Sequence, residues 1–92
     1  MTVSVVMITY NHEKYIGKAI EGVLSQTSEF EVELIIGNDN SPDNSHEIIM
    51  DIISSHPNGN WIRYTRHVKN LGPVRNSIWA FEQAKGNYVA IC

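Results

Sequence analysis

The 92-residue sequence contains a single cysteine, Cys92. One thiol excludes an internal disulfide and most structural zinc sites, because such zinc sites use several cysteines. A chain with so little cysteine suits a reducing compartment, so we expect a cytoplasmic protein.

Basic residues are also scarce. Seven Lys and Arg stand against ten Asp and Glu, which gives a net charge of −3 with neutral histidine. Binding of nucleic acid needs a clustered basic face, so no nucleic acid partner is expected. Residues 1–6 have neither a basic segment nor a long apolar run, so they predict no signal peptide, and nothing in the chain predicts a membrane anchor.

The glycine motifs of two common nucleotide sites are missing. After the first apolar run, residues 3–8, the chain reads Thr9-Tyr10-Asn11, with no Gly-x-Gly-x-x-Gly and no Gly-Lys-Ser/Thr. The dinucleotide fingerprint and the phosphate-binding P-loop are therefore excluded. The same loop lacks the acidic cluster of a response-regulator receiver, which makes that class unfavourable.

What the sequence does have is a regular alternation of strand and helix patterns. Short apolar runs predict strands at residues 3–8, 32–37, 61–67 and 88–92, and three-four spacing of apolar residues predicts helices between them. The order βαβαβαβ predicts an α/β fold with a Rossmann-like parallel sheet and helices on both faces. The strand at 61–67 alternates apolar and polar residues, which favours an edge position.

The last helix and the last strand carry two further expectations. The helix opens at Pro73, and its residues Val74, Ile78, Phe81 and Ala84 are expected to face inward. The strand at 88–92 has no covering helix after it, although a parallel sheet is normally covered on both faces. We therefore interpret residues 1–92 as part of a larger, truncated domain.

Ligands of open α/β sheets bind beyond the carboxyl ends of the strands. The candidates at these ends are Thr9, Tyr10 and Asn11 after the first strand, Asp39 after the second, and Asn70 and Arg75 after the third. An aromatic ring can stack on a base, a carboxylate can accept hydrogen bonds from a base or ribose, and an arginine can pair with a diphosphate.

Each candidate also has a purely structural interpretation. Tyr10 can belong to a polar turn that packs on the first helix, Asp39 can be a turn or capping residue, and Arg75 can be an ordinary surface arginine. Asp43 fits the turn or capping role better than a ligand role. The four histidines share no ligand-like spacing, so no metal site is expected within the chain.

Four blocks of the sequence form an ordered set of motifs. They are residues 3–11 (VSVVMITYN) with Tyr15-Ile16 and Ile20-x-x-Val23-Leu24-x-Gln26-Thr27, residues 33–45 (ELIIGNDNSPDNS), Asn70-x-Gly72 with Asn76, and residues 84–90 (AKGNYVA). In this order the blocks resemble the pattern of family 2 glycosyltransferases. Two positions depart from the family pattern, since Asn38 replaces the usual first Asp and Asn40 the usual Gly. Asn40 can still adopt the left-handed turn.

The resemblance implies the N-terminal half of a GT-A fold, with Thr9, Tyr10 and Asp39 holding the nucleoside of a nucleotide sugar, commonly a UDP-sugar. Asn11, Asn70 and Arg75 are further nucleotide-binding candidates. In the full-length enzyme it implies inverting transfer to a glycan acceptor in polysaccharide synthesis, with Mg²⁺ or Mn²⁺ on an Asp-x-Asp motif beyond Cys92. The acceptor region and the general base would also lie outside this chain, so we expect no metal binding and no transferase activity from residues 1–92 alone.

The full-length enzyme would work in the cytoplasm, including the inner face of the membrane. The competing interpretation is a non-catalytic α/β module that self-associates through the exposed edge left by the strand at 88–92, since unpaired strands favour such contacts.

Overall fold

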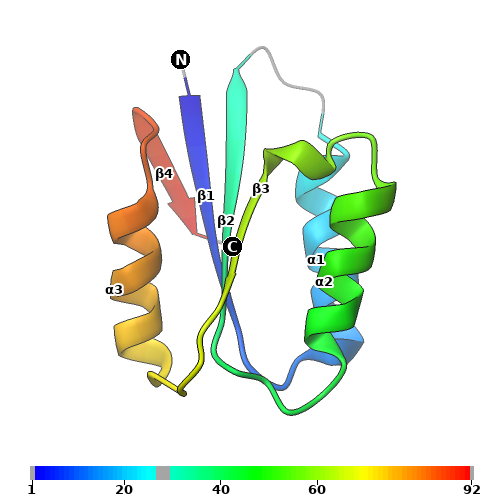
Figure 1. Ribbon diagram of the computed structural model, residues 1–92. Coiled ribbons are helices and arrows are strands. Elements are labelled where there is room, and N and C mark those ends of the chain that lie inside the picture. The colour runs from blue at the N-terminus through cyan, green and yellow to red at the C-terminus, as the bar shows by residue number, and fades with distance from the viewer. Residues whose placement is uncertain (1, 27–29, 92) are drawn as a thin grey trace.

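The computed structural model describes residues 2–26 and 30–91, which alternate between strand and helix as predicted (Figure 1). Thr27 and Cys92 lie outside the described residues. The elements, in chain order, are β1 (Thr2–Thr9), α1 (Glu13–Leu24), β2 (Glu31–Asn38), α2 (Ser45–Ser55), the 3₁₀ turn η1 (Gly59–Trp61), β3 (Ile62–Arg66), α3 (Pro73–Gln83) and β4 (Tyr88–Ile91).

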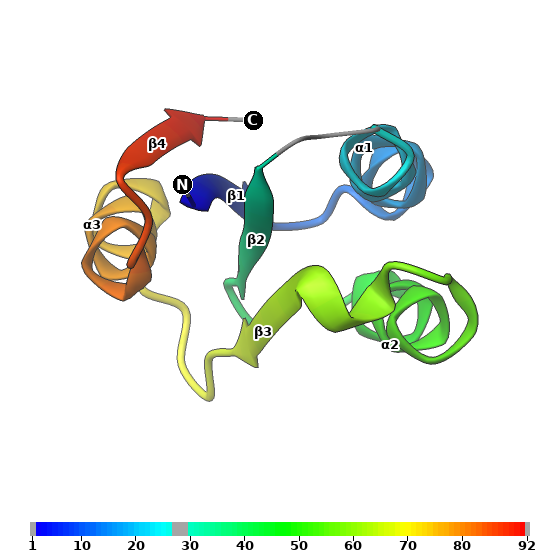
Figure 2. The same cartoon turned by 90° about the horizontal axis from the view of Figure 1, so that it is seen from above.

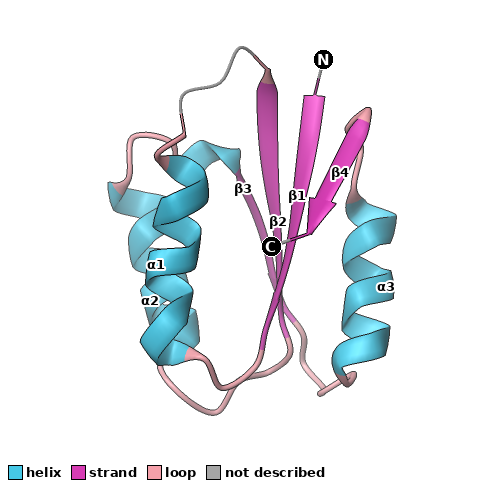
Figure 3. Ribbon diagram, turned by 180° about the vertical axis from the view of Figure 1, so that it is seen from behind, coloured by secondary structure: helices cyan, strands magenta, loops and turns pink. Residues whose placement is uncertain are grey.

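The strands form one parallel sheet in the order β3-β2-β1-β4. Helices α1 and α2 lie on one face and α3 lies on the other, as the views from above and from behind show (Figures 2 and 3). The predicted Rossmann-like fold with helices on both faces is thereby confirmed. So is the edge position of β3, although its first predicted residue, Trp61, belongs to η1.

The main core lies between the sheet and the α1–α2 layer. Helix α1 buries Ile16, Ile20 and Leu24, which are spaced four residues apart and therefore lie on one side of the helix. They pack with apolar side chains of the two central strands and α2, among them Met7, Leu34, Ile36, Ile49 and Ile52. Full burial of each such side chain contributes about 1.5–3 kcal/mol, so this cluster is the main source of stability.

The predicted inward face of α3 is wrong. Val74, Ile78 and Phe81 are 71%, 55% and 43% exposed, whereas Asn76 and Ala80 are buried. The helix approaches the sheet at Gly37, where an added Cβ would lie 2.4 Å from Asn76 Oδ1. The space between α3 and Gly37 has room only for small or hydrogen-bonded side chains of the helix. The apolar stripe of α3 therefore faces outward. Ala84 is half-buried and packs on the smaller cluster of Val6, Ile35 and Ala80.

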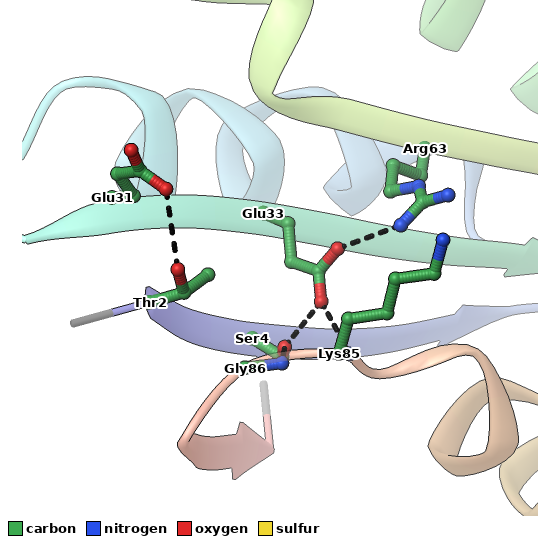
Figure 4. A network of polar contacts seen from close by, with 7 residues as sticks. All are labelled: Thr2, Ser4, Glu31, Glu33, Arg63, Lys85 and Gly86. Carbon is green, nitrogen blue, oxygen red and sulfur yellow. Dashed lines mark hydrogen bonds and ion pairs between the residues drawn. The ribbon is translucent and has the colours of Figure 1, made fainter.

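Strand β4 is held mainly by polar contacts, because all four of its residues are exposed. Glu33, a buried carboxylate of β2, lies at the centre of the contacts drawn in Figure 4. Its Oε2 accepts hydrogen bonds from the Ser4 hydroxyl on β1 and from the Lys85 amide, 2.7 Å away, in the loop that leads to β4. Its Oε1 accepts from Arg63 Nη1 on β3 at 2.9 Å.

The chain passes close to β1 at Gly86, next to this network. The Gly86 amide donates to Ser4 Oγ at 2.8 Å, and an added Cβ there would lie 2.7 Å from the Thr2 carbonyl oxygen. Only glycine allows this approach without a shift of the backbone. Glu33 therefore joins three strands to the segment that enters β4.

Burial alone would raise the pKa of Glu33, but the hydrogen bonds from Ser4, the Lys85 amide and Arg63 outweigh it and lower the pKa. A carboxylate with a lowered pKa in the folded state stabilises the fold above the unfolded pKa of about 4.3. That stabilisation is lost as the pH falls through the folded value.

None of the helices in the described residues is long and apolar enough to cross a membrane.

Replacement of Glu33 by alanine should lower the free energy of unfolding by about 2–3 kcal/mol at pH 7, because buried donors lose their acceptor. With Glu33→Gln, the loss of stability between about pH 5 and pH 3 should be smaller than in the original chain. Urea denaturation at several pH values measures both effects. Glu31→Gln, which alters an exposed carboxylate of the same strand, should change little. An unaltered pH dependence in Glu33→Gln would contradict the assignment.

Candidate functional site

The loops after β1, β2 and β3 come together at one end of the sheet, the lower end in Figure 1. They enclose a pocket of about 600 Å³. The pocket is lined by Ile8, Thr9, Tyr10, His12, Asp39, Asn40, Pro42, Asn70, Pro73 and Asn76. The ligand position expected for an open α/β sheet thus coincides with a pocket in the structure.

Four of the six predicted site residues line this pocket: Thr9, Tyr10, Asp39 and Asn70. Asn11 and Arg75 do not. Asn11 shapes the turn after β1, with a φ of 59° and its amide donating to Ser41 Oγ at 3.0 Å. Arg75 is exposed on the first turn of α3, where no hydrogen bond or ion pair to another described residue engages its side chain.

The two residues that β1 contributes differ in exposure. Tyr10 is 46% exposed, so nearly half of its surface is open to a ligand. Thr9 is almost fully buried, and its Oγ1 has no hydrogen-bond partner among the described residues. Tyr10 is therefore the accessible group of this loop, while Thr9 forms the base of the pocket.

Asp39 is the most highly connected residue of the site. Only 3% of its surface is exposed, and its carboxylate accepts two backbone hydrogen bonds, from the Leu71 amide at 2.6 Å and from the Gly72 amide at 2.9 Å. Its own carbonyl accepts from Asn70 Nδ2 at 3.1 Å, and its amide donates to the Thr9 carbonyl at 2.9 Å. Asp39 therefore holds the loops after all three strands together.

The loops after β1 and β2 are joined a second time through Ser41. Its hydroxyl accepts from the Asn11 amide, and its own amide donates to Asn38 Oδ1 at 3.0 Å. Asn40 has a φ of 59°, so the left-handed turn expected of it is present. Asparagine tolerates this conformation better than most residues other than glycine.

Asp43 serves the helices rather than the pocket. Its Oδ2 accepts from the Glu13 amide at the start of α1, and its Oδ1 accepts from the Ser45 amide at the start of α2, both at 3.1 Å. Burial opposes ionisation, but hydrogen bonds from Ser45 and from the Glu13 amide outweigh it and lower the pKa of Asp43. The capping role predicted for Asp43 is confirmed, and a single carboxylate serves two helices.

Asn38, which stands where the family pattern has an acid, does not line the pocket. It is fully buried, and its Nδ2 donates to the Tyr64 hydroxyl at 3.0 Å. That hydroxyl lies 2.7 Å from His46 Nδ1. Burial raises the pKa of Tyr64, although the Asn38 hydrogen bond opposes the rise. The neutral side-chain amide of Asn38 thus forms a hydrogen bond with a half-buried tyrosine and places no charge beside it.

Three polar residues of the pocket lining are not among the six sequence candidates: His12, Asn40 and Asn76. The sequence pattern could have indicated Asn76 as a site residue, because it lies in the first turn of the helix that follows a strand end. His12 occupies the N-cap position of α1 without making a side-chain cap. In the described ranges 2–26 and 30–91, no three His, Cys, Asp or Glu side chains form a group that could hold a metal ion.

The family model described as glycosyl transferase family 2 matches residues 4–92. The minor teichoic acid biosynthesis protein GgaB of Bacillus subtilis is 36% identical over 87 residues, which are 94% of this chain and 9% of GgaB. The chain spans about a quarter of the length of the first curated relatives that it matches.

Solved structures give the same match. S. aureus TarS 1–349 in complex with UDP has a TM-score of 0.84 and 28% identity, covering 100% of this chain and 27% of that one. The mannosyltransferase PcManGT of Pyrobaculum calidifontis, in complex with GDP-Man and Mn²⁺, has a TM-score of 0.81 and 19% identity over 95% of this chain and 25% of its own. At that identity, PcManGT shows a shared fold.

Replacement of Asp39 by asparagine should release the loop after β3, because one carboxylate oxygen becomes an NH₂ group that cannot accept a backbone hydrogen bond. The expected loss is about 1–3 kcal/mol in the free energy of unfolding. Hydrogen exchange at the Leu71 and Gly72 amides should become faster, as measured by NMR. Asp51→Asn, at an exposed position of α2, is the matched control. Protected amides at 71 and 72 in Asp39→Asn would exclude the tether.

Proposed function

The chain belongs to glycosyl transferase family 2, and from this membership we propose that it forms the part of such an enzyme that binds the nucleotide of a nucleotide-sugar donor. The observation that carries the proposal is the pocket at the carboxyl ends of the parallel strands, with Tyr10 and Asp39 in its lining. Sites at this place in an open α/β sheet are the usual ligand sites.

Recognition of the base is assigned to the loops after β1 and β2. The exposed ring of Tyr10 offers a stacking surface for a base. Each Asp39 oxygen accepts one backbone hydrogen bond and retains a lone pair that can accept a base N–H. Asn70, which also lines the pocket, adds an amide that can donate or accept. Solved structures of TarS with UDP and with UDP-GlcNAc support a uridine nucleotide as the ligand.

The diphosphate is assigned to the start of α3. Pro73 and Asn76 of its first turn line the pocket, so the positive end of the helix dipole lies beside it. Arg75 is exposed in the same turn, and its long side chain provides a cation for a phosphate that extends beyond the pocket. Asn11 contributes by holding the turn that carries Tyr10 rather than by contacting the nucleotide.

The described residues do not fit Mg²⁺ or Mn²⁺. The single carboxylate of the pocket lining, Asp39, already accepts two backbone hydrogen bonds and is nearly buried. A hard cation would need several free oxygen ligands. In a full-length enzyme of this family, the metal ligands, the general base and the acceptor site for the glycan are therefore proposed to come from residues outside this chain. The chain alone is proposed to bind nucleotide without metal and to have no transferase activity.

The broader activity proposed for the full-length protein is inverting transfer of a sugar to a glycan acceptor. The similarity to GgaB, a minor teichoic acid biosynthesis protein, supports a cell-surface polysaccharide as the acceptor class. A cytoplasmic position, at the inner face of the membrane, is proposed with it, because such a site would give access to both the donor and a growing surface glycan.

Calorimetric titration of the chain with UDP should show weak binding that does not change when Mn²⁺ is added. Tyr10→Ala should weaken this binding by about tenfold, the effect of losing one base–aromatic stack. Tyr88→Ala, which removes an exposed tyrosine at the start of β4, should leave the affinity unchanged. GDP and dTDP titrations establish the preference for the base.

If circular dichroism shows that the chain is folded and it still binds no UDP, this result would argue strongly against the nucleotide site. Equal loss of affinity in Tyr10→Ala and Tyr88→Ala would show that the tyrosine of the pocket has no special role. Binding that requires Mn²⁺ would overturn the conclusion that the described residues do not hold the metal.

A second function, self-association, is favoured by β4. The strand is an edge of the sheet, all four of its residues are exposed, and Tyr88, Val89 and Ile91 are large and apolar. Open edges of this kind template pairing with another chain. We propose that copies of the chain associate through this edge.

Sedimentation velocity over a range of concentrations should detect this association. Val89→Lys should weaken it, because a lysine on an edge strand opposes pairing. Met50→Lys, at an equally exposed apolar position of α2, should not. A monomer at every concentration would reject the proposal.

A further inference from the structure

The loop of residues 68–72, between β3 and α3, reaches the pocket lining through Asn70, and little of this wall is packed. Val68 is 92% exposed, and Lys69 and Asn70 are also exposed. Asp39 secures the far end of this loop through the amides of Leu71 and Gly72. The near end begins at His67, directly after β3, so the geometry of the wall also depends on what holds this residue.

His67 is held to α3 through Asn76, a residue of the pocket lining. The His67 Nε2 atom lies 2.9 Å from Asn76 Oδ1, across the base of the loop. The imidazole also meets the Trp79 ring edge-on, with ring centroids 4.6 Å apart and an angle of 89° between the planes. The backbone amide of His67 donates to the Asn38 carbonyl at 2.9 Å, which fixes the residue to β2.

The direction of the His67–Asn76 hydrogen bond follows from the second partner of Asn76. Asn76 is 1% exposed, and its Nδ2 lies 3.0 Å from the Gly37 carbonyl oxygen. A carbonyl only accepts, so the amide nitrogen of Asn76 must face Gly37 and its oxygen must face His67. The Nε2 atom of His67 therefore carries the proton and donates. Both the Nε2–H tautomer and the imidazolium satisfy this arrangement.

We propose that His67 is a positioning residue for the nucleotide pocket, which acts through Asn76 to fix the loop of residues 68–72 and with it Asn70 of the pocket lining. This inference rests on the proposed nucleotide-binding function. The loop is anchored at both ends, by the Asp39 carboxylate at residues 71 and 72 and by the His67–Asn76 hydrogen bond across its base. Loss of the second anchor lets the loop move and open more often, which also weakens the bonds of the first anchor at residues 71 and 72. Ligand affinity therefore falls while the core remains packed.

Three variants test the proposal. His67→Ala removes the donor, and His67→Gln restores a donor of similar reach. His56→Ala is the matched control, because His56 is also half-buried and its side chain accepts one hydrogen bond, from the Asn58 amide. It lies at the carboxyl end of α2 and does not line the pocket. The measurements are UDP affinity by calorimetry and hydrogen exchange at the Leu71 and Gly72 amides by NMR.

In His67→Ala, both the dissociation constant for UDP and the exchange rates at 71 and 72 should rise by about fivefold to tenfold, as expected for loss of one partly buried hydrogen bond. His67→Gln should return both close to the original values, and His56→Ala should change neither. Exchange rates in His67→Ala that match those of His56→Ala would overturn the proposal.

The two readouts separate this inference from the function on which it rests. If the original chain binds no UDP, the proposed function fails, while faster exchange in His67→Ala alone still establishes the anchor. If His67→Ala does not fold, the chemical shifts of the two ring nitrogens of His67 in the original chain show which nitrogen carries the proton. A proton on Nε2 is expected, and an Nδ1–H tautomer with unprotonated Nε2 would overturn the hydrogen bond to Asn76.

Discussion

The pocket depends on one carboxylate and on the hydrogen bonds that it accepts from two backbone amides. Asp39 directly follows β2, and its side chain holds the Leu71 and Gly72 amides of a loop more than thirty positions later in the chain. Hydrogen bonds to a charged acceptor are stronger than those between neutral groups. An otherwise exposed loop is thereby attached to the rigid centre of the sheet. The pocket depends on that attachment, because Asn70 of the same loop is part of its lining.

Each polar residue at the end of β2 and in the loop after it makes a different contact. Asn38 faces inward to Tyr64, Asp39 reaches the third loop, Ser41 reaches the first loop, and Asp43 caps two helices. A turn rich in Asn, Asp and Ser is therefore a junction for the whole carboxyl edge of the sheet. Most of its side chains accept hydrogen bonds from backbone amides, which would otherwise remain unpaired at loop and helix starts.

Much of the fold could be predicted because its signals are local. The stripe of Ile16, Ile20 and Leu24 and the apolar strand runs are readable from spacing alone, and the strand–helix order restricts the topology. The inner face of α3 could not be read in this way. Its apolar stripe is Val74, Ile78 and Phe81, but the close approach at Gly37 favours the opposite, smaller face. The spacing of apolar residues shows that a helix is amphipathic and does not show which neighbour it packs against.

The same distinction applies to the site. Tyr10 and Asp39 could be placed at one edge of the sheet because parallel strands end together. The partners of Asp39 could not be predicted, since they are backbone amides that carry no residue-specific signal. His67 and Asn76 are likewise brought together by the path of the loop between them.

The position of β1 between β2 and β4 has a consequence for how the protein is made. Thr2 and Asn87, which are 85 positions apart, exchange backbone and side-chain hydrogen bonds where β4 joins the sheet. On the ribosome, β1 therefore emerges well before residues 88–91, and its second edge stays unpaired until they are made. During that interval its open edge is available to other nascent chains, and such distant pairings are slow to form. A chaperone bound to the open edge of β1 until β4 is made would prevent such contacts.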